Sequence, residues 1–199
     1  MDAVPSKPML ATVMNFLQYT GGLIIDLRRN SGGQPETVAL LASYFLGPEP
    51  VHTNSIYWRD TDKTEDFLTT EHVDGAWYGT ERPVYILTSS STFSAAEGFS
   101  SAMQATGRGT IIGEVTRGGA NPGGVFAIDN NFWIWISTGR ASTPINNSSW
   151  EGVGVIPDIQ LDAESARVQA EKMLLQDVIA MTDDPQAKFD RQQALRALD

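Results

Sequence analysis

Two segments of the chain follow the same pattern, in which a short apolar strand runs through a turn into a helix. The first joins Leu23–Leu27 to a helix that starts at Pro35, through a turn that contains Gly32-Gly33. The second joins Pro83–Leu87, through a hydroxyl-rich turn, to a helix that starts after Ser94. Continuous apolar strands are typical of sheets buried on both faces, and proline suits the first turn of a helix. The repeated pattern predicts an α/β domain in which helices cover a sheet.

The remaining segments add hairpins in the middle of the chain and helices at its end. Turn-forming residues separate the expected strands, and aspartates precede the expected helices. We expect one domain over residues 1–181 and a helical tail over residues 182–199. The expected elements are strands at Val51–Arg59 and Phe67–Val73, a hairpin of Val125–Ile128 with Phe132–Ser137, and helices from Asp162 to about Met181 and from Pro185.

The composition excludes several classes of function. The 199 residues carry a formal net charge of -10, which makes nucleic acid and anionic membranes poor partners. The chain has no cysteine, so disulfides and thiolate metal sites are excluded. No apolar run approaches the roughly 20 residues of a membrane span. We therefore expect no metal, no organic cofactor and no membrane span. A helical pattern that starts almost at Met1 indicates a piece of a longer protein, so the compartment stays open: an export signal would lie upstream.

Ser94 is the candidate nucleophile. It lies where the turn meets the helix, and at such a position backbone N–H groups are unpaired and the helix dipole favours negative charge. A serine nucleophile needs that environment because its attack creates an oxyanion. A serine at a helix start is more commonly an N-cap, and Glu97 completes a Ser-x-x-Glu capping box. This pattern alone favours capping.

The Gly32-Gly33 turn has three interpretations. A glycine turn between a strand and a helix can bind phosphate, but this one matches neither GxGxxG nor GxxxxGK[ST]. It can also be a tight turn that needs positive φ, which is the simplest interpretation. In the third interpretation one of its backbone N–H groups belongs to an oxyanion hole.

Four blocks of sequence, taken together, favour the catalytic interpretations of Ser94 and of the Gly32-Gly33 turn. They are Leu23–Gly33, Thr88–Glu97, Gly107–Gly119 and Gly152–Ile159. In this order and with this spacing they resemble the S41 peptidases, the C-terminal processing peptidases and their relatives, over roughly residues 10 to 180. The resemblance implies a ClpP/crotonase-like fold of stacked β-β-α units with outer helices. It also implies that Ser94 is the nucleophile, and that Ala95 N–H and an N–H of Gly32 or Gly33 form the oxyanion hole.

The chain departs from the processing peptidases at the general base. Their base is a lysine in a Thr-x-Gly-Lys-Gly loop, and here Gly119 takes the lysine position. Arg117 cannot replace it, because a guanidinium stays protonated. The Gly-Gly loop resembles instead the tricorn-type branch, which includes the modules of interphotoreceptor retinoid-binding protein. There a histidine from an N-terminal segment is the base, and Glu151 would orient it. A surface glutamate in a loop is an equally good interpretation of Glu151.

Neither histidine of the chain, His52 nor His72, lies where that branch places its base. We therefore expect an upstream segment to supply it. The expected function is hydrolysis of peptide bonds in a peptide or protein substrate, through an acyl-enzyme on Ser94, with weak or no activity in this chain. The alternative is a non-catalytic module that binds apolar ligands such as retinoids or fatty acids. Five tryptophans could line such a groove, but core packing or a dimer face is the commoner role: Trp58, Trp77, Trp133, Trp135 and Trp150. Trp133 and Trp135 share one face of a strand.

Overall fold

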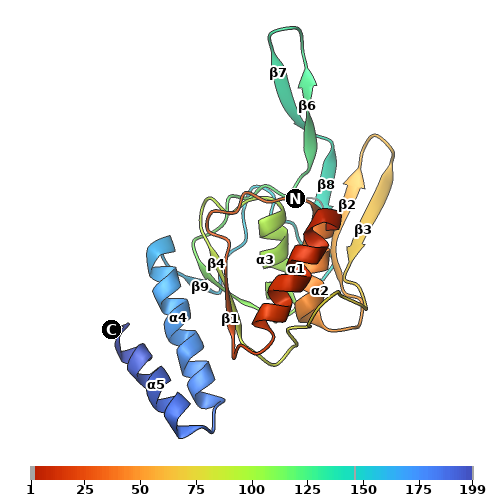
Figure 1. Cartoon of the computed structure of the whole chain (residues 1–199). Helices are drawn as coiled ribbons and strands as arrows, with labels where there is room; N and C mark the ends of the chain where they lie inside the picture. Colours follow the sequence, from red (N-terminus) through yellow and green to blue (C-terminus); the bar gives the residue numbers. More distant parts are fainter. Residues whose placement is uncertain (1–2, 146, 199) are drawn as a thin grey trace.

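The computed structural model describes residues 3–145 and 147–198, and helices and strands are mixed along the chain (Figure 1). The elements are α1 (Ala3–Leu17), β1 (Leu23–Asp26), α2 (Pro35–Leu46), β2 (His52–Trp58), β3 (Lys63–Leu68), β4 (Val84–Thr88), α3 (Ala95–Ala105), β5 (Thr110–Gly113), β6 (Gly123–Ala127), β7 (Trp133–Ser137), β8 (Gly139–Ser142), β9 (Ile159–Gln160), α4 (Ala163–Ala180) and α5 (Pro185–Arg196). The α/β class predicted from the two strand–turn–helix segments is confirmed.

Two strand predictions need correction. The partner of β2 begins at Lys63, whereas the sequence predicted a strand over Phe67–Val73. Residues 63–66 are exposed polar positions on an edge strand, so they lack the apolar alternation that marks a strand. The short strand β8 was not predicted, because its four residues, Gly139–Ser142, include only one apolar side chain.

The central sheet is parallel and has the strand order β1-β4-β5-β9. Strands β1 and β4 pair in register from Leu23 with Val84 to Asp26 with Leu87. The two turns that follow these strands therefore leave the sheet at the same edge. In open parallel sheets this carboxyl edge is where ligands commonly bind.

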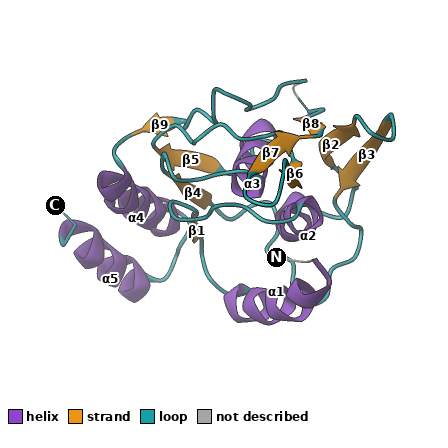
Figure 2. Ribbon diagram, turned by 90° about the horizontal axis from the view of Figure 1, so that it is seen from above, coloured by secondary structure: helices purple, strands orange, loops and turns teal. Residues whose placement is uncertain are grey.

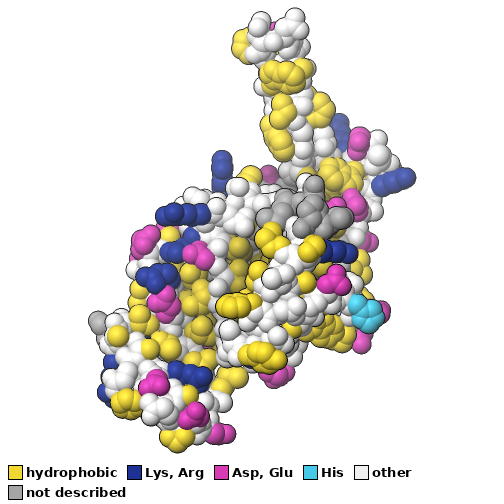
Figure 3. Space-filling model, viewed as in Figure 1, with side chains coloured by type: hydrophobic (Ala, Val, Ile, Leu, Met, Phe, Trp, Pro, Cys, Tyr) yellow, Lys and Arg dark blue, Asp and Glu magenta, His cyan; other side chains and the backbone are white. Residues whose placement is uncertain are grey.

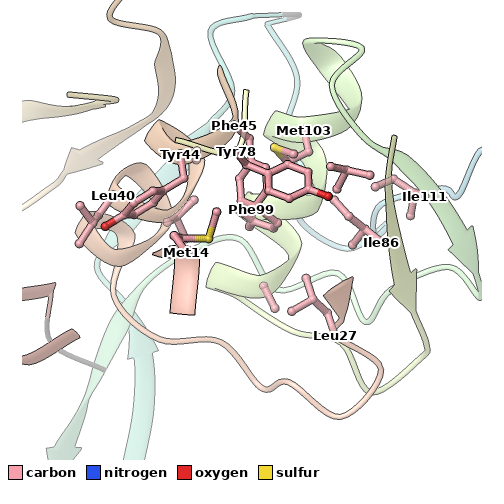
Figure 4. Close-up of a cluster of buried hydrophobic side chains, with 14 residues drawn as sticks. Met14, Leu27, Leu40, Tyr44, Phe45, Tyr78, Ile86, Phe99, Met103 and Ile111 are labelled. Atoms are coloured by element: carbon pink, nitrogen blue, oxygen red, sulfur yellow. The ribbon is translucent and has the colours of Figure 1, made fainter. Parts of the chain in front are cut away.

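Helices cover both faces of this sheet. Helices α1, α2 and α3 lie on one side, and α4 and α5 lie on the other (Figures 1 and 2). The side chains of β4 alternate accordingly: Ile86 packs in the cluster formed with the first group, which Figure 4 shows, and Leu87 packs against α4. Every residue of β4 is buried, as the continuous apolar pattern predicts.

The other strands form two smaller sheets. Strands β3, β2 and β8 form an antiparallel sheet beside α2, and β6 pairs with β7 alone. The β6–β7 hairpin projects from the body at the top of Figure 1. No helix within the described residues is long and apolar enough to cross a membrane.

Candidate active site

Hydrogen bonds join the two turns at the carboxyl edge of the sheet. Thr92 Oγ1 donates to Leu27 O at 2.9 Å, Ser89 Oγ donates to Arg28 O at 2.6 Å, and Phe93 N donates to Asn30 O at 3.0 Å. Thr92 is fully buried. The hydroxyl-rich composition of the second turn is thus explained, because these side chains satisfy backbone carbonyls of the first turn.

Charged groups hold the outer side of the same two turns. Ser90 N donates to Glu114 Oε2 at 2.9 Å, and this hydrogen bond lowers the pKa of the Glu114 carboxyl. Arg28 donates to Ala163 O at 2.6 Å and pairs with Asp26 at 2.7 Å, and the hydrogen bond from Arg28 lowers the pKa of Asp26. The first turn is thereby fixed to the start of α4.

Ser94 has an unusual backbone conformation at the start of α3. Its φ is 55° and its ψ is -123°. The N-caps of α4 and α5, Asp162 and Asp184, have extended backbones, and the side chain of each accepts from two backbone N–H groups. A positive φ outside glycine is uncommon, and strained residues of this kind cluster at functional sites. The predicted capping box with Glu97 is present, so Ser94 is the N-cap of α3, but its strained backbone sets it apart from the caps of α4 and α5.

Gly32 lies directly against Ser94. Its φ is 105°, and a Cβ on Gly32 would lie 2.7 Å from Ser94 Cβ and 3.0 Å from Ala95 N. Gly32 N donates to Asn30 Oδ1 at 2.8 Å. Gly33 N has no acceptor among the described residues. Positive φ and close approach both require glycine at position 32, as the tight-turn interpretation predicts.

Glu97 is a buried carboxylate that connects the start of α3 to the glycine-rich loop after β5. Its exposed fraction is 0%, and it accepts from Ser94 N at 2.7 Å. It also accepts from Thr116 Oγ1 at 2.6 Å, Gly118 N at 2.6 Å and Gly119 N at 2.9 Å. The sequence pattern indicated only a capping role for Glu97. The glycine-rich loop after β5 could have indicated the second role of Glu97, because the backbone N–H groups of a buried loop need an acceptor.

The position of the absent lysine is filled by another side chain. A Cβ on Gly119 would lie 1.9 Å from Cε2 of Phe93. The guanidinium of Arg117 lies 4.8 Å from the centre of the same ring. The Phe93 ring therefore occupies the space that any side chain at position 119 would enter.

Glu151 contacts the next residues of the same loop. Its Oε2 accepts from Ala120 N at 2.7 Å and from Asn121 N at 2.9 Å. Within the described residues its Oε1 accepts no hydrogen bond. Glu151 thus holds the loop that leads into β6 and leaves one carboxylate oxygen open.

A cavity of about 260 Å³ opens beside Ser94. Its walls come from the Gly33 turn, the start of α2, strands β2 and β3, and the loop before β6. Ser94, Ala95, Trp58 and Trp150 are among its lining residues. The buried Trp150 Nε1 has no hydrogen-bond partner, and neither has Asn54 Oδ1. The cavity combines apolar walls with a few polar groups, as ligand sites do.

Neither histidine lines this cavity. His52 Nε2 lies 2.8 Å from Ser55 Oγ and 3.2 Å from Asp66 Oδ1 on the β2–β3 ribbon, and His72 lies in the loop after β3. The four lysines also lie outside the cavity. Within residues 3–145 and 147–198 no cluster of histidine, aspartate and glutamate could hold a metal ion.

The core-packing interpretation of Trp133 and Trp135 is wrong. Their exposed fractions are 66% and 61%. Trp58 and Trp150, in contrast, line the Ser94 cavity, and Trp150 is 5% exposed. The alternation of β7 was identified correctly, but exposure depends on what packs against the strand, which alternation does not show.

The parallel sheet thus brings two turns together around Ser94 at the start of α3. The family model of peptidase family S41 matches residues 5–161, and the chain belongs to this family. A carboxyl-terminal-processing protease from Synechocystis sp. is 28% identical over 141 residues, which are 71% of this chain and 31% of that protein.

Solved structures share the fold. A photosystem II D1 C-terminal processing protease has a TM-score of 0.60 at 24% identity, covering 81% of this chain and 39% of that one. An S41-assigned protein from Bacteroides fragilis has a TM-score of 0.65 at 20% identity, covering 83% and 44%. The fold is therefore ClpP/crotonase-like, as predicted. The chain spans about a third of the length of the curated relative and less than half of either structure.

Proposed function

We propose that this chain carries the nucleophile and the oxyanion hole of an S41-type serine peptidase. The family and its processing-protease relatives support a peptidase function. The observation that carries the proposal is Ser94, held in a strained backbone conformation at the start of α3 and facing a cavity. The substrate would be a peptide or protein, and attack by Ser94 Oγ would form an acyl-enzyme.

Two backbone N–H groups would stabilise the oxyanion of the tetrahedral intermediate. Ala95 N lies at the first position of α3, and Gly33 N lies on the turn that contacts Ser94. Gly32 N is a weaker candidate because it already donates to Asn30. Donors of this kind contribute roughly 3–4 kcal/mol each to the transition state.

The general base would come from outside these 199 residues. The Phe93 ring fills the lysine position, and neither histidine lines the cavity. We propose a histidine base, as in the tricorn-type branch, with the open Oε1 of Glu151 orienting it. Residues 1–181 would then be the catalytic domain. Residues 182–199 would be an accessory tail, since α5 has no buried residue.

The alternative, a carrier of apolar ligands, is less well supported. A mostly apolar cavity of about 230 Å³ lies between α1, α2 and the Gly32-Gly33 turn. Pockets that enclose a drug-sized ligand measure about 300–1,000 Å³. The Synechocystis relative is a protease, and this cavity is small for a retinoid or a fatty acid.

Covalent labelling tests the proposed nucleophile. A fluorophosphonate should label the chain slowly and at Ser94, as intact mass and peptide mapping would show. Ser94→Ala should abolish the label. Ser91→Ala is the matched control, because Ser91 is an exposed hydroxyl of the same turn, and it should label like the unchanged chain. Equal labelling of Ser94→Ala, or no labelling after long incubation at high probe concentration, would rule the nucleophile out.

A further inference from the structure

The β6–β7 hairpin pairs with no other strand of the described chain. We call residues 123–137 the arm. Its two strands form five residue pairs with each other, from Gly123 with Ser137 to Ala127 with Trp133, and they form a sheet of their own. The outer edges of both strands are therefore unpaired within the described residues. A two-stranded hairpin is marginally stable in water when nothing packs on it.

Both faces of the arm are apolar and exposed. The side chains alternate between faces, so Trp133 and Trp135 share one face and Ile134 lies on the other. Figure 3 shows hydrophobic side chains along the whole projection. Eight large apolar residues of the arm have exposed fractions of 44–66%: Val125, Phe126, Ile128, Phe132, Trp133, Ile134, Trp135 and Ile136.

The exposed area matches one half of a protein–protein interface. An aromatic side chain buries roughly 150–250 Å² when fully covered and an aliphatic one less, so the eight side chains, about half exposed, present on the order of 800 Å² over both faces of the arm. A standard interface buries about 800 Å² on each partner. Monomers rarely expose a contiguous apolar patch larger than a few hundred Å², so the arm marks an interaction surface.

Charge argues for a second copy of the same chain as the occupant. The arm contains no lysine or arginine, and Asp129 at its tip is its only acidic residue. Interfaces are depleted of charge at their centre, and such a surface is self-complementary in a two-fold dimer. Because the arm projects from the body, the bodies of two copies, each with a net charge of -10, can stay apart. The hydrocarbon core of a membrane is a poor alternative partner for the arm, because it would leave the backbone groups at the open strand edges without hydrogen bonds.

We propose that the arm is the dimerisation element of this chain, and that both of its apolar faces, one with Trp133 and Trp135 and the other with Ile134, pack against a second copy. Gly123, where the arm begins, lines the cavity beside Ser94. Dimerisation would thus immobilise one wall of that cavity. This proposal does not depend on the peptidase function.

Sedimentation velocity at chain concentrations from about 1 to about 100 μM tests whether the arm dimerises the chain. The chain should sediment as a dimer of twice 21.7 kDa. Trp133→Ser with Trp135→Ser should raise the dimer dissociation constant roughly a hundredfold, because buried tryptophans dominate interface energies. Phe16→Ser is the matched control: Phe16 is an aromatic residue of α1 that is 84% exposed, and its loss should leave the dimer unchanged. Added salt should strengthen the dimer, because it screens the repulsion between two acidic bodies.

Three results would overturn the proposal. They are a wild-type chain that stays monomeric throughout this range, a dimer that survives the double tryptophan substitution, and a monomer that instead co-sediments with vesicles of phosphatidylcholine and phosphatidylserine. Far-UV circular dichroism checks that each variant is folded. If the double tryptophan variant is unfolded, Trp135→Ser alone is used in its place.

Discussion

Replacement of Glu97 by glutamine should lower the free energy of unfolding by roughly 3–5 kcal/mol. The carboxylate is fully buried, and its two oxygens accept four hydrogen bonds, from Ser94 N, Thr116 Oγ1, Gly118 N and Gly119 N. A glutamine presents one oxygen and an NH₂ group in the same place, so its amide hydrogens would face N–H donors. Buried donors left without an acceptor are costly. Urea unfolding followed by circular dichroism measures the change.

Glu71→Gln is the control for this substitution. Glu71 is an exposed glutamate in the loop after β3, so the change should stay within about 0.5 kcal/mol. Glu97→Gln should also slow labelling of Ser94 by a fluorophosphonate, since Glu97 positions the Ser94 backbone. A loss of less than about 1 kcal/mol would contradict the structural role assigned to Glu97.

A lysine at position 119 should be tolerated only if Phe93 is shortened. Gly119→Lys alone should destabilise the chain by roughly 3 kcal/mol, because even its Cβ would overlap the Phe93 ring. Phe93→Ala opens the space, so Phe93→Ala with Gly119→Lys should be more stable than the sum of the single changes predicts. A double-mutant cycle should give a favourable coupling of about 1–3 kcal/mol. Additive effects would show that the ring does not fill this space.

The same double variant should also gain activity. In processing peptidases, which the chain resembles, a lysine in this loop is the base for the serine. A positioned base contributes roughly 10²–10⁴-fold, so ester hydrolysis that depends on Ser94 should rise at least tenfold. Adding Ser94→Ala to the double variant is the control, and it should remove the gain.

The sequence predicted the parts of the fold that depend on local pattern. The two strand–turn–helix segments and the helix after Asp162 are found where apolar periodicity and capping residues placed them. Strand β3 was placed too late because its first residues face solvent on a sheet edge, where selection for apolar side chains is absent. The exposure of Trp133 could not be predicted, since it depends on what packs against the hairpin.

The candidate site could be predicted only in part for a related reason. Ser94 and the glycine turn were found from motifs, but the contact between Gly32 and Ser94 depends on the parallel register of β1 with β4. The ring of Phe93 against Gly119 is a three-dimensional contact that no single motif encodes. The sequence shows that Gly119 stands where processing peptidases have a lysine, and the Phe93 ring is the physical reason why a lysine does not fit there.

Chemical rescue is the sharpest test of whether Ser94 is a nucleophile that lacks its base in this chain. Hydrolysis of a peptide with a fluorogenic leaving group would be followed with and without imidazole, for the unchanged chain and for Ser94→Ala. Imidazole should raise the Ser94-dependent rate at least about tenfold from a very low level, because it can enter the open cavity and accept the serine proton. A Ser94-dependent rate as high as that of an ordinary peptidase, and unchanged by imidazole, would contradict this interpretation. The base would then already be present within these 199 residues.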